Sequence, residues 1–126
     1  MIPTFIRGYE AAAAITGYRI VKFADPANGQ TIALADGSTA ASLGVSDSMG
    51  ALAGGMCDVH RAGLVPVILG GPVSAGDPLT SDADAAAVLA VATASTTLRI
   101  VGFADEPGIA GDTIMAFLAP GLLHEA

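Results

Sequence analysis

The sequence predicts an all-β protein: a small antiparallel β-barrel or sandwich built from hairpins, with an extended N-terminal arm. Short runs rich in β-branched residues recur along the 126-residue chain. Sixteen glycines and seven prolines separate these runs, at the spacing of roughly 8–12 residues that is typical of barrels and sandwiches. In chain order, the expected strands cover residues 18–23, 31–35, 43–46, 56–61, 64–69, 98–103 and 113–118.

The run MCDVHR at residues 56–61 alternates in a way that fits a strand with one wet side. Successive side chains of a strand point to opposite faces. We therefore expect Met56, Asp58 and His60 on one face, and Cys57, Val59 and Arg61 on the other.

Two segments are ambiguous. Residues 47–55 fit a helical turn or a loop. Residues 81–94 carry many alanines, which favour a helix, but also Val88, Val91 and Thr93, which favour a strand. We favour the strand because the surrounding segments are β.

The chain divides into an arm at residues 1–17, a barrel or sandwich domain at 18–121 and a short tail at 122–126. The arm is apolar without a regular pattern, so it either covers its own barrel or docks on a partner. We expect the tail to be loosely ordered.

The composition is unusually apolar, with 52% hydrophobic and only 13% charged residues. No run approaches the ~20 apolar residues of a membrane-spanning helix, so we expect no membrane partner. A weakly charged surface of this kind is typical of proteins that assemble. The net charge of −7 and the absence of a basic cluster argue against direct nucleic-acid binding.

Three aspartates around a Gly-Asp-Pro corner are the first candidates for a site. Asp77, Asp82 and Asp84 lack the central Gly and the closing Glu of a calcium loop. We therefore interpret Gly76-Asp77-Pro78 as a turn and the other two aspartates as a solvated hairpin tip. We expect no metal.

Nucleophilic and cofactor chemistry have little support. Cys57 is the only cysteine, and His60 would lie on the opposite face of the same strand. No Gly-x-Ser-x-Gly elbow occurs, and the only lysine, Lys22, lies inside a strand-like run rather than at a hairpin tip. We expect no catalytic residue and no cofactor.

Several segments, in this order, resemble the small capsid decoration (cement) proteins of tailed bacteriophages. They are YRIVKF from Tyr18, LGVSDSMGALAGGMCDVHRAG from Leu43, GGPVSAGDPLTSDADA at residues 70–85, VGFADEPGIAGD and FLAPG. The resemblance extends from about residue 18 to residue 121. One position departs from the pattern: after TSDAD a turn glycine is expected, and this chain has Ala85-Ala86.

The resemblance implies a β-rich, generally trimeric, non-enzymatic protein on the outer surface of the expanded capsid. It would be made in the cytoplasm of the bacterial host, and it would bridge major capsid proteins and brace the shell. Its partners would be the major capsid protein and further copies of itself.

Within this interpretation we assign capsid binding to the N-terminal arm, with Ile2, Pro3, Phe5, Ile6, Arg7 and Tyr9 as contact residues. The alternative for the arm is that it covers only its own barrel or a sister subunit. Two other functions remain open from the residues alone. One is a small β-barrel ligand-binding or accessory domain without catalysis, and the other is a metal-dependent hydrolase using Asp77, Asp82 and Asp84.

Overall fold

The computed structural model describes residues 2–125, with side chains for residues 5–124. Every regular element in this range is a β-strand, which confirms the all-β prediction. The described residues contain no helix long and apolar enough to cross a membrane. The strands are β1 (Ile2–Ala11), β2 (Ile20–Phe23), β3 (Thr31–Leu34), β4 (Ser42–Ser46), β5 (Met56–Ile68), β6 (Pro78–Ser81), β7 (Ala87–Leu89), β8 (Thr96–Ala104) and β9 (Thr113–Glu125).

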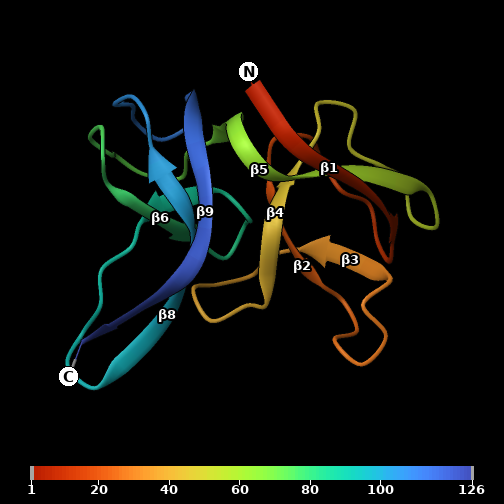
Figure 1. Ribbon diagram of the computed structural model, residues 1–126, viewed down its shortest axis with the longest axis horizontal. Helices are drawn as coiled ribbons and strands as arrows, with labels where there is room; N and C mark the ends of the chain where they lie inside the picture. Colours follow the sequence, from red (N-terminus) through yellow and green to blue (C-terminus); the bar gives the residue numbers. More distant parts are fainter. Residues whose placement is uncertain (1, 126) are drawn as a thin grey trace.

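Five strands close into a barrel in the order β1-β3-β2-β4-β5, because β1 also pairs with β5. The barrel is mixed rather than purely antiparallel, since β1 and β3 run parallel. The remaining strands continue from β5 as β9-β8-β6-β7. Figure 1 shows β1–β4 on one side of the molecule and β6, β8 and β9 on the other, with β5 passing between the two groups.

Two apolar cores result from this arrangement. One lies inside the barrel and includes Tyr9, Val21, Ile32 and Val59. The other lies between the outer side of the barrel and the second group of strands, and its members include Ile20, Val45, Val65, Val67, Leu69, Leu79 and Ile114. Ile20 and Val21 are consecutive and both fully buried, one in each core. Burial of β4 and of the first half of β2 on both faces accounts for part of the high hydrophobic content of the chain.

The N-terminal segment is extended, as predicted, but it forms a wall of the barrel and is not set apart from it. β1 pairs with β5 from Ile2↔Leu64 to Glu10↔Met56, and Tyr9 and Ala11 contribute to the inner core. The C-terminal segment also differs from the prediction, because residues 122–125 are paired to β8 as the end of β9 instead of forming a loose tail.

The run MCDVHR is a strand, but only its first half has the predicted wet face. Met56 is 69% exposed, whereas His60 is 2% exposed. The difference arises because His60 pairs with Val45, whose side chain lies in the second core. The outer side of the barrel is therefore covered at this point.

The ambiguous segment at residues 81–94 forms a turn followed by the short strand β7, Ala87–Leu89. Ala85 takes a left-handed conformation with φ of 65°. Glycine adopts this conformation more easily than any other residue, and a turn glycine is the residue that was expected after TSDAD. Residues 47–55 form a loop with turns and no helix.

Candidate binding surface

Of the three candidate aspartates, Asp77 and Asp82 act as turn caps, and the three do not form a shared site. The Asp77 carboxylate accepts a hydrogen bond from the Ser74 backbone N–H at 2.8 Å. Asp82 Oδ1 accepts from the backbone N–H groups of Asp84 and Ala86, at 2.8 and 3.0 Å. Within the described residues, no group of three His, Cys, Asp or Glu side chains could hold a metal ion. The turn interpretation therefore has direct geometric support.

Cys57 and His60 lie on opposite sides of the barrel wall, as strand parity predicts. Burial raises the pKa of the Cys57 thiol, and the nearby Asp58 and Asp47 carboxylates raise it further. His60 instead contacts Asp47, with its Nε2 3.1 Å from Asp47 Oδ1. Local sequence patterns do not reveal this pair, because the two residues meet only through the register of β4 against β5.

The predicted capsid-binding residues of β1 have different environments. Phe5 and Ile6 are 52% and 47% exposed, and Arg7 is exposed as well. Tyr9 is only 2% exposed and lies in the inner core, so it is no surface anchor. Ile2 and Pro3 belong to the backbone of β1, and their side chains lie outside the described residues.

One edge of β1 is open. β5 occupies one edge along nearly the whole strand, but on the other edge β3 pairs only with Glu10 and Ala11. No described strand pairs with that edge between residues 2 and 9. Open strand edges accept an extended segment of a partner through backbone hydrogen bonds. Phe5, Ile6 and Arg7 therefore lie on a strand that is able to extend its pairing.

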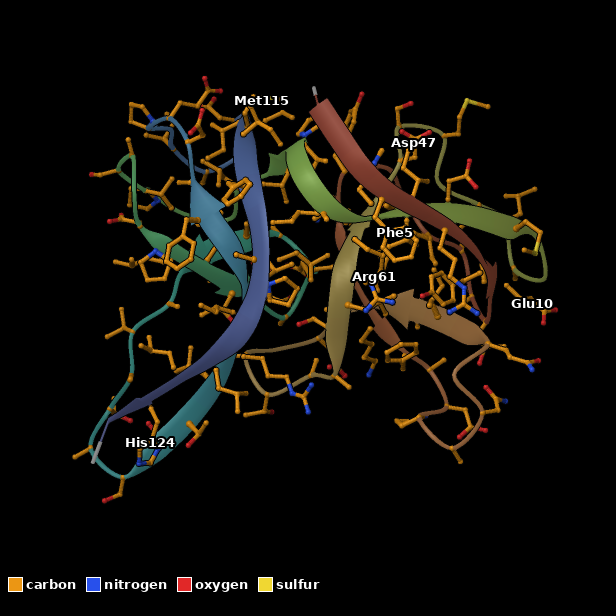
Figure 2. The ribbon with its side chains drawn as sticks, viewed as in Figure 1. Phe5, Glu10, Asp47, Arg61, Met115 and His124 are labelled. Carbon is orange, nitrogen blue, oxygen red and sulfur yellow. The ribbon has the colours of Figure 1, made fainter. Side chains whose placement is uncertain are left out.

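Arg7 and Arg61 converge on the hydroxyl group of Tyr9. Arg61 Nη1 donates to Tyr9 Oη at 2.7 Å, and Arg7 Nη1 approaches the same oxygen at 3.5 Å. The Arg7 guanidinium also lies over the Tyr9 ring, 4.7 Å from its centroid. Figure 2 shows Arg61 next to Phe5 in this region, consistent with the pairing of Phe5 with Ala62. We call Arg7, Tyr9 and Arg61 the arginine–tyrosine cluster.

Arg61 was missing from the predicted site. Its alternation with Cys57 and Val59 placed it on the covered face of the strand, where a charged residue needs a partner. A charged residue on the same strand face as Cys57 and Val59 was the only signal in the sequence that could have identified Arg61 as part of a site.

A second exposed surface lies on the outer side of β5, β9 and β8. Leu64 pairs with Phe117, and Phe117 pairs with Phe103, so the three side chains form a row across the strands. Pro66 and Met115 form the next row. Phe117 is 55% exposed. We call these five residues the outer apolar face; contiguous apolar surface of this kind typically marks an interaction site.

The ends of β8 and β9 form a projecting two-stranded ribbon. Thr96–Ile100 pairs with Gly121–Glu125, whereas β5 pairs with β9 only as far as Leu118. Figure 1 shows this ribbon leaving the body, with the C-terminus at its tip. A two-stranded ribbon is marginally stable in water by itself, and one edge of distal β9 has no pairing strand within the described chain.

These features define a closed five-stranded β-barrel that shares one strand with a second sheet. Among solved structures, the chain is similar to the N base of the head fibre protein gp8.5 of bacteriophage phi29. The TM-score is 0.68 and the sequence identity 20%, over 94% of this chain and 95% of that one. At this identity the likeness shows the fold. No protein-family model matches the chain, and no curated protein matches it either.

Proposed function

We propose that this protein is a non-enzymatic structural component of a bacteriophage virion that decorates the outer surface of the capsid. The observation that carries the proposal is the near-complete overlap of its fold with the base of a phage head fibre protein. The resemblance of residues 18–121 to capsid decoration proteins points to the same class.

In this role the protein binds major capsid proteins after synthesis in the host cytoplasm, bridges neighbouring subunits and stabilises the shell. Each copy contributes only a modest contact, and a repeated lattice multiplies such contacts through avidity. The acidic balance of the chain suits a surface facing away from the packaged DNA.

We assign capsid contact to the open edge of β1, with Phe5, Ile6 and Arg7 as the side chains that reach the partner. Their exposure and the free backbone groups of the strand support this assignment. Tyr9 contributes indirectly by holding Arg7 in place.

We further propose that the protein is a homotrimer, assembled through the outer apolar face and the projecting ribbon. Both features would be liabilities on a monomer, because exposed apolar area and unpaired strand edges promote aggregation.

Co-sedimentation with purified expanded capsids of the encoding phage tests the proposal. Deleting residues 1–10 is unsuitable, because it removes a barrel strand. The informative variant is Phe5→Ser with Ile6→Ser, and the matched control is Met49→Ser with Leu52→Ser, two exposed apolar residues in the loop before β5. We expect wild type and control to co-sediment and the β1 variant to remain in the supernatant. Absence of binding by the folded wild-type protein would refute the function, and equal binding by both variants would refute the role of β1.

A further inference from the structure

We propose that the arginine–tyrosine cluster is a binding site for a carboxylate, supplied by an Asp or Glu side chain of the protein partner. The identity of that partner as the capsid rests on the proposed function. The chemistry of the site rests on the contacts of Arg7, Tyr9 and Arg61 alone.

The cluster holds more hydrogen-bond donors than acceptors. Each guanidinium carries five N–H donors, and a phenol can both donate and accept. The Tyr9 oxygen is the only side-chain acceptor that either arginine contacts within the described part of the chain. Because that oxygen accepts from the guanidinium groups, its own O–H is left to donate elsewhere. The Nε of Arg61 is buried and has no partner among the described residues. Arg7, Arg61 and the Tyr9 hydroxyl therefore hold donors for which no side-chain acceptor is present in the described part of the chain.

Arg7 and Arg61 lack an acidic partner although acidic residues outnumber basic ones in this chain. The chain has 12 acidic residues and only five Lys or Arg. The ion pairs among the described residues nevertheless join Lys22 to Asp36 and His60 to Asp47, and neither Arg7 nor Arg61 takes part in one. Two guanidinium groups near one phenol repel each other, and one of them is partly desolvated, so an added anion lowers the free energy of the cluster.

Glu10 is the nearest acidic residue along β1, but it does not fill this role. It is one residue from Tyr9, so its side chain points to the opposite face of the strand. Figure 2 shows Glu10 at the far end of the barrel from Arg61.

A carboxylate on a protein fits the site better than a polyanion does. A planar carboxylate matches the paired donors of a guanidinium. The long-range field of a chain with net charge −7 repels a nucleic acid, whereas a single carboxylate can be brought in by neighbouring apolar contacts. Phe5 provides such a contact, since it is exposed and lies on the same face of β1 as Arg7 and Tyr9, whereas Ile6 points to the opposite face.

The cluster is tested first through capsid affinity. Arg7→Gln removes the guanidinium charge and keeps a polar, exposed side chain, so the barrel should stay folded. Arg19→Gln is the matched control, because Arg19 is not ion-paired in the described chain and lies outside the surfaces assigned to binding and assembly. We expect Arg7→Gln to weaken binding by roughly tenfold or more, and Arg19→Gln to leave it unchanged. If wild type binds and both variants bind equally well, the inference is overturned while the proposed function stands.

A second measurement needs no capsid and so separates the two proposals. The side-chain Nε–H signals of the arginines are followed by NMR while sodium acetate or sodium phosphate is added. We expect acetate to shift the signals of Arg7 and Arg61 and to leave Arg19 unmoved. Tyr9→Phe, which removes only the hydroxyl group, should weaken this response. No selective shift with acetate, or a stronger and selective response to phosphate, would overturn the assignment to a protein carboxylate.

Discussion

The turn at Ala85 gives a quantitative prediction, because Ala85 and Ala86 are adjacent, buried and differ in backbone conformation. Ala85 has φ of 65°, whereas Ala86 is not among the positive-φ residues. Replacing a buried alanine by glycine removes a methyl group worth about 0.8 kcal/mol and adds a backbone entropy cost of about 0.5–1 kcal/mol. Ala86→Gly should therefore lower the free energy of unfolding by about 1.5 kcal/mol.

Ala85→Gly has the same two costs and one gain. A left-handed conformation costs a residue with a Cβ roughly 1–2 kcal/mol, and glycine avoids this cost. The net effect of Ala85→Gly should be close to zero, so the two variants should differ by roughly 1–2 kcal/mol. For a domain of this size that is a difference in Tm of about 4–8 °C.

The assay is urea and thermal denaturation of both variants and wild type at one fixed protein concentration, since association makes Tm concentration-dependent. Equal m-values would show that the unfolded states are comparable. If the two variants lose the same stability, the left-handed strain at Ala85 does not contribute and the reasoning fails.

Three further predictions concern the barrel wall, the inner core and the outer face. Gly44→Ala should lower the free energy of unfolding by about 1–3 kcal/mol, because the new Cβ would lie 2.2 Å from a carbonyl oxygen of β5. Gly37→Ala is the control and should be neutral or slightly stabilising, because nothing lies within 4 Å of its Cβ position. Equal denaturation midpoints for the two variants would contradict this. Burial raises the pKa of the Cys57 thiol above its ordinary value of 9.0. The contribution of the protonated thiol to the free energy of unfolding is therefore complete below pH 9.0, and it is lost as the pH rises through the folded-state pKa. Alkylation of Cys57 by iodoacetamide near pH ~8 should therefore follow unfolding, and fast alkylation of the folded protein would contradict the burial. Phe117→Ser should lower the mass measured by sedimentation from that of the proposed trimer towards that of a monomer. Val91 is also an exposed apolar residue, and Val91→Ser should leave the mass unchanged. An unchanged mass for Phe117→Ser would exclude the outer apolar face as the interface.

The strand content was predictable because turn residues and β-branched runs are local signals. The paired burial of Ile20 and Val21 was not, since alternation assumes that one face of a strand is wet. In this fold β2 lies between two cores, so both faces are dry. The burial of His60 was missed for the same reason, because it depends on which strands cover the barrel from outside.

The candidate site was predictable only in part. Phe5, Ile6 and Arg7 were selected from their position in an apolar N-terminal segment and lie at the surface, and their role as contact residues stays a prediction. The aspartate turn was interpreted correctly from its residue types. Arg61 lies 52 residues from Tyr9 in the sequence, and only the register of β1 against β5 brings the two together. A contact of this kind depends on tertiary pairing, which local patterns do not encode.

In the function proposed above, the position of β1 couples binding to folding. The same strand supplies Tyr9 and Ala11 to the inner core and offers Phe5, Ile6 and an open edge to a partner. A partner that pairs with this edge binds only the folded chain, so it stabilises the barrel in proportion to its occupancy. Conversely, a substitution that loosens β1 from β5 weakens binding even where it touches no contact residue. Stability therefore has to be measured beside affinity for every variant of β1, and a loss of binding without a loss of stability is the result that identifies a true contact.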